Sequence, residues 1–211
     1  AKGHGDVNGD GYEDILIGAP QYEIDGGYAR LYFGSADFDT IPDRIFTLPN
    51  TVEFGYSCAI LEDINNDGFD DFIISDPQYT INYPVDGAAF LYFGSDTVDT
   101  DPDLSFFGSY WYHMLGREVS GAGDVNGDGY NDWIISNDNI IGRGEILLYF
   151  GNEIPDNGCD VCFRGSDILY KFDNPMLNDI NGDNYDDLIF YYEFGDVEIH
   201  FGSEDIDTIP D

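Results

Sequence analysis

The stretch DVNGDGYED at residues 6–14 decides the fold, because it recurs along the chain in close copies that align with it without insertions or deletions. The later copies are DINNDGFDD at residues 63–71, DVNGDGYND at 124–132 and DINGDNYDD at 179–187. Self-similarity at a nearly constant period is the signature of a repeat architecture, in which each unit buries its apolar surface against its neighbours. The sequence therefore predicts four tandem units of roughly 55 residues each.

Two more markers follow every acidic stretch, always in the same order. The first is a segment containing Phe-Gly, at residues 31–35, 91–95, 148–151 and 200–203. The second is a turn containing Pro-Asp, at residues 39–43, 99–103, 154–156 and 207–211. Three ordered markers in four copies are not expected by chance, so we interpret the chain as a single repeat domain spanning residues 1–211.

Each unit is expected to be β-structure throughout. A short apolar run rich in β-branched and aromatic residues follows each acidic stretch, as expected for a buried strand. These runs are Ile15-Leu16-Ile17, Phe72-Ile73-Ile74, Trp133-Ile134-Ile135 and Leu188-Ile189-Phe190. The Phe-Gly segment, the residues after the Pro-Asp turn and the residues before the next acidic stretch complete a set of four strands. No long helix is predicted.

The predicted fold class is therefore all-β, with propeller-type blades of four antiparallel strands. The approximate blades are residues 1–48, 49–107, 108–164 and 165–211. Relative to the earlier copies, the last unit stops at its Pro-Asp turn, so we expect the last blade to be incomplete. The chain shows no initiator methionine and no signal peptide, which favours a mature or excised part of a larger propeller or array.

Oxygen donors alternate along each acidic stretch at positions 1, 3, 5 and 9, and position 7 offers a backbone carbonyl. Alternating donors on a tightly wound loop can converge on one cation, and hard oxygen ligands select Ca²⁺ over softer metals. The predicted ligands are Asp6, Asn8, Asp10, Tyr12 and Asp14; Asp63, Asn65, Asp67, Phe69 and Asp71; Asp124, Asn126, Asp128, Tyr130 and Asp132; and Asp179, Asn181, Asp183, Tyr185 and Asp187. The sequence thus predicts about four calcium ions, one per repeat.

Two further positions in the loops refine this prediction. Position 6 must turn sharply, which suits Gly11, Gly68 and Gly129, with Asn184 as the best-tolerated substitute in the fourth copy. An EF-hand loop would need a bidentate glutamate at position 12. Here an isoleucine or phenylalanine of the following strand occupies that position, so the cation is expected inside a β-connection. Asp, Asn and Gly also populate ordinary turns, but four such loops in register favour metal binding.

The charge of the chain narrows the classes of partner. The sequence holds 43 acidic residues against 7 basic ones, a formal net charge of −36, and four calcium ions would offset only part of it. Nucleic acids and anionic membranes are recognised through lysine and arginine, so neither is an expected partner. No apolar run approaches the ~18 residues of a membrane-spanning helix, so membrane insertion is not expected. With 42% hydrophobic and 16% aromatic residues, the chain is also not expected to be disordered.

The sequence resembles FG-GAP repeats, the units of the integrin α-subunit β-propeller and of many bacterial secreted proteins. Gly18-Ala19-Pro20 matches the "GAP" element, and Phe54-Gly55 and Leu115-Gly116 fall where the family has its "FG" element. The resemblance implies one Ca²⁺ per loop on one face of the propeller, with partner contacts often on the opposite face. The sequence departs from the family pattern at Ser75-Asp76-Pro77 and Ser136-Asn137-Asp138, which replace GAP. Family propellers commonly have seven blades rather than four, so a closed ring is not assumed.

We therefore expect a non-catalytic, extracellular calcium-binding module for adhesion or structural assembly, secreted to the cell surface or built into a fibre. Its partner would be a protein or glycan on the exterior, or copies of itself and neighbouring repeats. Two alternatives stay open: a lectin-like propeller, in which Tyr22, Tyr79 and Tyr83 would stack on sugars, and an accessory domain of a secreted hydrolase.

The histidines and cysteines do not suggest catalysis. His4, His113 and His200 occupy unrelated positions in their repeats, so no catalytic residue is predicted. Cys159 and Cys162 form a lone C-x-x-C with no second pair, which disfavours a four-thiolate zinc site. A local disulfide and two reduced thiols remain equally open for this pair.

Overall fold

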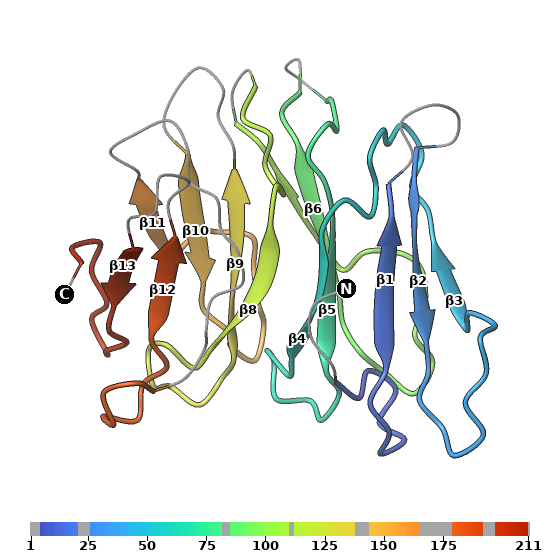
Figure 1. The fold of residues 1–211 in the computed structure, drawn as a ribbon, viewed down its shortest axis with the longest axis horizontal. Helices are drawn as coiled ribbons and strands as arrows, with labels where there is room; N and C mark the ends of the chain where they lie inside the picture. The colour runs from blue at the N-terminus through green and yellow to red at the C-terminus, as the bar shows by residue number, and fades with distance from the viewer. Residues whose placement is uncertain are drawn as a thin grey trace.

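Four antiparallel β-sheets stand side by side in the order of the sequence, from the first at one end of the molecule to the fourth at the other (Figure 1). This computed structural model describes residues 5–20, 26–81, 85–109, 112–137, 144–164, 179–191 and 197–210. We call the four sheets blades 1 to 4. Among the described residues there is no helix that is long and apolar enough to cross a membrane.

The strands of each blade follow one another as neighbours in the sheet. Blade 1 contains β1 (Ile15–Ala19), β2 (Tyr28–Tyr32) and β3 (Arg44–Phe46). Blade 2 contains β4 (Cys58–Glu62), β5 (Asp71–Asp76), β6 (Ala88–Tyr92) and β7 (Leu104–Phe107). Blade 3 contains β8 (Val119–Gly123), β9 (Asp132–Asn137), β10 (Glu145–Tyr149) and β11 (Val161–Arg164). Blade 4 contains β12 (Leu188–Tyr191) and β13 (Val197–His200).

The all-β prediction is confirmed, and blades 2 and 3 have the expected four antiparallel strands. In blade 1, an isolated antiparallel bridge between Gly5 and Asp14 stands where β4 meets β5 in blade 2. The described sheets form a row rather than a closed ring (Figure 1). The ranges predicted for the units remain predictions.

The core of the molecule lies between the blades. In β5, Phe72 and Ile74 face blade 1 and pack with Leu16 and Leu31, whereas Ile73 faces blade 3. All six residues of β5 are buried, and so are all six of β9. Strands buried on both faces are continuous apolar runs rather than alternating patterns, which is why the runs after each acidic stretch contain three apolar residues in a row. Each such side chain contributes about 1.5–3 kcal/mol by leaving water.

A cluster of three rings repeats at each junction between blades. The three clusters are Phe46, Phe72 and Tyr92; Phe106, Trp133 and Tyr149; and Phe163, Phe190 and His200. In the first, Phe72 and Tyr92 stack with centroids 5.0 Å apart, and Phe46 meets both edge-on. His200 takes the place of the tyrosine in the third cluster and is 2% exposed. It is therefore a packed strand residue at the end of β13.

Candidate metal loops

All four acidic stretches lie along one edge of the row of blades, at the bottom of Figure 1, where each connects two strands or leads into one. Position 6 of every loop has a left-handed backbone. The φ angles there are 87° at Gly11, 95° at Gly68, 91° at Gly129 and 72° at Asn184. No atom lies within 4 Å of where a Cβ would stand on the three glycines. Glycine is therefore needed for its backbone freedom and not for space, and asparagine can replace it.

The oxygens at positions 1, 3 and 5 point into their own loop. In the first loop, the Asp6 carboxylate accepts hydrogen bonds from the amides of Asp10 (2.9 Å) and Gly11 (2.7 Å), and Asn8 Oδ1 accepts a second bond from Asp10 (3.0 Å). Asp10 Oδ1 in turn accepts a bond from the Tyr12 amide at 2.9 Å. The other three loops repeat this pattern. The loop amides thus hold three oxygen donors on the inner side of each loop.

The carboxylate at position 9 of each loop is fully buried and accepts hydrogen bonds from two backbone amides. Asp71 Oδ2 accepts the amide of Ile64 at 3.1 Å, and its Oδ1 accepts the amide of Gly94 at 2.8 Å. Asp14, Asp132 and Asp187 make the equivalent pairs of bonds, and all four side chains are 0% exposed. The second donor is the glycine of the Phe-Gly marker in each blade. The sequence showed that both markers recur together but not that they touch.

Burial disfavours ionisation of three position-9 carboxylates, those of Asp14, Asp71 and Asp132, and raises their pKa. Burial, with a smaller contribution from the carboxylates of Asp67 and Asp63, raises the pKa of Asp71 to about 8 despite its two backbone hydrogen bonds. The same causes raise the pKa of Asp132 to about 8 and that of Asp14 to about 6. Among the described residues, no lysine, arginine or histidine forms a salt bridge with a carboxylate at position 1, 5 or 9 of a loop.

The donor set of each loop fits a hard divalent cation. It combines uncompensated carboxylates, one amide oxygen and no sulfur or imidazole, which is the chemistry that Ca²⁺ prefers. Within the described ranges, no three His, Cys, Asp or Glu side chains stand close enough together to hold a metal as they are. The position-1 and position-5 carboxylates accept hydrogen bonds from loop amides instead. The ligand set therefore stays a prediction.

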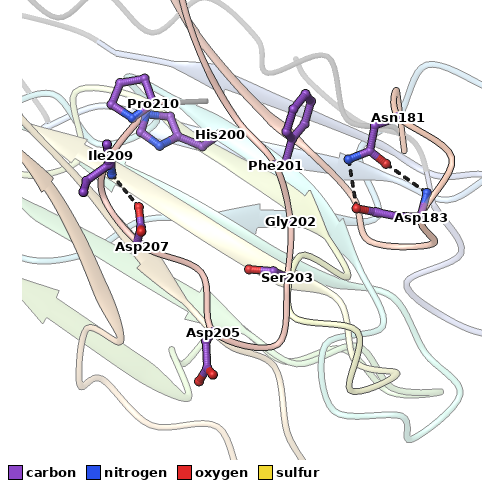
Figure 2. Close-up of a pocket in the computed structure, with 10 residues that line it drawn as sticks. All are labelled: Asn181, Asp183, His200, Phe201, Gly202, Ser203, Asp205, Asp207, Ile209 and Pro210. Atoms are coloured by element: carbon purple, nitrogen blue, oxygen red, sulfur yellow. Dashed lines mark hydrogen bonds between the residues drawn. The ribbon is translucent and has the colours of Figure 1, made fainter.

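The fourth loop is open to solvent. A cleft of about 380 Å³ borders it, with Asn181 and Asp183 on one side and Asp207 and Ile209 on the other (Figure 2). Asn181 Nδ2 donates to Asp183 Oδ2 at 2.8 Å, and Asn181 Oδ1 accepts the Asp183 amide at 2.9 Å. An ion could thus reach the donors at positions 3 and 5 directly from water.

Neighbouring loops are joined by residues that the sequence did not single out. Asp70, at position 8 of the second loop, accepts the amide of Asp6 at 2.6 Å and donates its own amide to the Asp6 carbonyl at 3.1 Å. Asp186 and Asp124 repeat both bonds between the fourth and third loops, at 2.9 and 3.0 Å. Between the second and third loops, Asn131 makes a longer contact of 3.4 Å to the Asp63 carbonyl. The loops therefore form one connected edge.

Aromatic rings at position 7 strengthen these connections. A Cβ on Gly9, at position 4 of the first loop, would lie 2.7 Å from Cε1 of Phe69 in the second loop. The ring of Tyr185 covers Gly127 in the same way. Position 7 was predicted to offer only its carbonyl, but in the second and fourth loops its side chain also covers the preceding loop. Glycine at position 4 leaves room for that ring.

The residues considered for sugar stacking or catalysis have packing roles where the structure describes them. Tyr79 is half-buried, and its ring meets Phe90 edge-on at 5.6 Å. This packing does not favour a lectin-like site there. Tyr22, Tyr83 and His4 lie outside the described residues.

His113 and the cysteine pair are also accounted for. The buried His113 accepts the Ser109 amide at Nδ1 (3.1 Å), and its Nε2 lies 3.3 Å from Glu145 Oε2. Cys159 and Cys162 are free thiols whose sulfurs lie 3.4 Å apart. Neither feature assembles a nucleophile with a base.

Comparison with known proteins agrees with this geometry. Residues 3–30, which include Gly18-Ala19-Pro20, match the family model of the FG-GAP repeat. Integrin alpha-7 of Rattus norvegicus is 34% identical over 138 residues, covering 62% of this chain and 12% of the relative. Integrin alpha-7 of Homo sapiens is 30% identical over 160 residues, covering 71% and 13%. Integrin alpha-PS3 of Drosophila melanogaster is 29% identical over 142 residues, covering 62% of this chain and 12% of the relative.

The chain thus spans about an eighth of the length of these relatives. It belongs to the FG-GAP repeat family, of the kind found in integrin α-subunits.

Proposed function

We propose that this chain is a non-catalytic calcium-binding module that acts outside the cell in adhesion or structural assembly. The observation that carries the calcium part is the buried position-9 carboxylate, which has no cationic partner among the described residues and shares its loop with further oxygen donors at positions 1, 3 and 5. A divalent cation would replace the proton that burial otherwise holds on Asp71 and Asp132.

Each calcium ion would be held by the predicted donors of one loop, at positions 1, 3, 5, 7 and 9. Because those loops lie along one edge and connect neighbouring blades, the ions would stabilise the junctions between blades as well as the individual loops. An ion that binds only the folded chain stabilises it by RT ln(1 + [L]/Kd). Millimolar calcium outside cells is sufficient for sites with Kd values of about 10⁻⁴–10⁻³ M.

The adhesion part of the proposal rests on similarity to integrin α-subunits. That similarity supports a location at the cell surface and a protein partner on the exterior. We infer that this partner binds the edge opposite the metal loops, the upper edge in Figure 1, because the family resemblance implies partner contacts there. The strong negative charge of the chain favours a partner surface rich in lysine and arginine.

Calorimetric titration of the metal-free chain with CaCl2 tests the calcium sites. We expect about four bound ions, and Asp128→Ala should remove about one, because Asp128 supplies the position-5 oxygen of the third loop. Asp99→Ala is the matched control, since Asp99 lies in a Pro-Asp turn, where its carboxylate accepts the Asp101 amide at 2.9 Å. A chain that takes up no calcium would refute the sites, and four ions on the Asp128→Ala variant would refute this ligand assignment.

A further inference from the structure

Blade 3 departs from blades 1 and 2 at the turn that leads into its outer strand. In blade 2 this turn ends at Asp103, whose amide donates to the Leu91 carbonyl at 2.9 Å and whose Oδ2 accepts the Phe93 amide at 2.7 Å. Asp43 makes the same two bonds in blade 1, and Asp160 makes them in blade 3. These three aspartates therefore occupy one position of the repeat.

The residues on either side of that aspartate differ in blade 3. The residue before it is Pro42 in blade 1 and Pro102 in blade 2, but Cys159 in blade 3. Two residues after the aspartate, blade 2 has Ser105 and blade 3 has Cys162. The two cysteines thus stand where another blade has a proline and a serine.

Proline restrains this turn in blades 1 and 2. Its ring fixes φ at about −65° and removes conformations from the unfolded chain, which stabilises the folded turn. The sequence markers paired residues 154–156 with this turn in the third copy, but the hydrogen bonds place Asp160 there instead. Pro155 therefore lies earlier in the turn of blade 3, and no proline precedes its outer strand directly.

The sulfur atoms of Cys159 and Cys162 lie next to each other at this position. Cys159 is exposed, Cys162 is half-buried in β11, and their Sγ atoms are 3.4 Å apart. Cys159 Sγ also donates to the Val161 carbonyl at 3.2 Å. The sulfurs of a disulfide are about 2.05 Å apart, so these two need to approach by only about 1.4 Å. The exposed Cys159 side chain can move without displacing the core.

The surroundings of the pair do not fit the other common roles of a C-x-x-C motif. Within the part of the chain that the structure describes, no three His, Cys, Asp or Glu side chains could hold a metal together. Partial burial of its sulfur and the hydrogen bond with Cys162 raise the pKa of Cys159, whereas thiol–disulfide catalysts need a lowered pKa. Cys58 is no competing partner, because it packs between blades 1 and 2 and Cys162 packs against the core between blades 2 and 3.

We propose that Cys159 and Cys162 form a disulfide, which restrains the turn into β11 in place of the proline of the other blades. The oxidant is a small-molecule disulfide such as oxidised glutathione. The thiolate of one cysteine attacks it, which forms a mixed disulfide and releases one glutathione. The thiolate of the second cysteine then attacks the protein sulfur of the mixed disulfide, and the second glutathione leaves. The protein loses two electrons and two protons, and the two released glutathione thiols carry them.

The compartment decides which form of the pair is present. Disulfides persist in the oxidising surroundings outside cells and are reduced in the cytosol. The expectation that the natural protein carries the bond therefore rests on the proposed function outside the cell. Formation of the bond in a purified sample does not, because it depends only on the geometry of the turn and on the oxidant.

Thiol mapping tests whether the bond forms. The purified chain is equilibrated with reduced and oxidised glutathione, alkylated with iodoacetamide under denaturing conditions and digested with trypsin. Residues 144–164, between the cleavage sites at Arg143 and Arg164, form one peptide that contains both cysteines, and Cys58 lies in another peptide. We expect peptide 144–164 to remain unalkylated and to have lost the mass of two hydrogen atoms, while Cys58 is alkylated.

Melting temperatures test the restraint on the turn. The oxidised wild type should melt about 4–8 °C above the reduced wild type, because a bond across residues 159–162 removes conformations from the unfolded chain. Cys159→Ser/Cys162→Ser is the control, and its melting temperature should not depend on the redox buffer. Cys159→Pro/Cys162→Ser should melt about 1–4 °C above that control, because it gives blade 3 the proline and serine of blade 2.

Several results would overturn the disulfide and the restraint. Peptide 144–164 alkylated at both cysteines after oxidation, carrying glutathione, or linked to a second chain would refute the bond. An oxidised chain that melts no higher than the reduced one, or a proline variant that melts no higher than its serine control, would refute the restraint. Calcium titration of both redox forms keeps this test apart from the proposed function. Neither cysteine is a predicted ligand, so a chain that binds no calcium can still form the bond.

Discussion

Gly18 and Gly55 pass each other so closely that a Cβ on Gly18 would collide with the carbonyl oxygen of Gly55. Gly18 belongs to the GAP element of blade 1 and Gly55 to the FG element that leads into blade 2. The Gly55 amide donates to the Ser75 carbonyl at 2.9 Å, and its φ angle is 84°. The two elements for which the family is named are therefore the two sides of one contact between neighbouring blades.

Gly55→Ala should destabilise the chain by about 2–4 kcal/mol. Alanine is strained in the left-handed backbone conformation of this position, and its Cβ would collide with backbone atoms of blade 1. A Cβ at this position would also lie 3.0 Å from the Ala19 amide nitrogen. Gly68→Ala is the control, because Gly68 has a φ of 95° but no atom within 4 Å, and its expected cost is about 1 kcal/mol. Urea unfolding in calcium-free buffer measures both. Equal losses for the two variants would contradict the proposed contact.

Removing calcium should lower the stability of the chain. With calcium at a hundred times the Kd, each site contributes about 2.7 kcal/mol to the free energy of unfolding. Thermal melting with calcium and after chelation measures the difference, and magnesium at the same concentration is the control, because it prefers a smaller octahedral site. An unchanged melting temperature after chelation would count against structural calcium.

The metal-free chain should lose stability as the pH rises from about 4 to 8. Folding raises the pKa of Asp71 and Asp132 from 3.8 to about 8. In that interval Asp71 and Asp132 hold protons in the folded chain that they have released in the unfolded chain, so the stability that these two groups contribute is greatest below pH 4 and falls until pH 8. Calcium competes with those protons, so the rise in melting temperature on adding calcium should be larger at pH 8 than at pH 5.

Urea unfolding across this pH range in the presence of chelator measures the trend. High salt screens the general repulsion among exposed carboxylates, and the decrease should persist there because Asp71 and Asp132 are buried. A free energy of unfolding that rises between pH 5 and 8 without calcium would show that these carboxylates are ionised in the folded chain.

Asp70→Ala should cost about 1–3 kcal/mol, because it leaves the Asp6 amide without its acceptor at the junction of blades 1 and 2. Asn131→Ala removes the equivalent side chain between the second and third loops. Its contact to Asp63 is 3.4 Å long, so the cost there should be smaller. Urea unfolding of both variants in calcium-free buffer compares the two junctions, and a greater loss for Asn131→Ala would contradict this ranking.

Long-range contacts explain what sequence reasoning missed at the site. The loop positions, the left-handed position 6 and the strands after each loop depend on neighbours a few residues away, and these were predictable from the repeat. The Asp71 carboxylate binds the Gly94 amide, and Asp70 binds Asp6 across the blade junction. Those pairs are distant along the chain, and a repeat pattern shows only that their members recur together.

The sequence by itself determined the repeat, the all-β class and the alternating oxygen donors, because glycine positions, apolar runs and donor spacing act locally through backbone geometry. The tertiary structure alone decided that the position-9 carboxylates are buried, that Tyr79 packs against Phe90, and that Ile17 remains exposed while Ile74 is buried. Ile17 and Ile74 occupy the same position of the repeat. Their exposure differs because only a neighbouring blade can exclude water from that face.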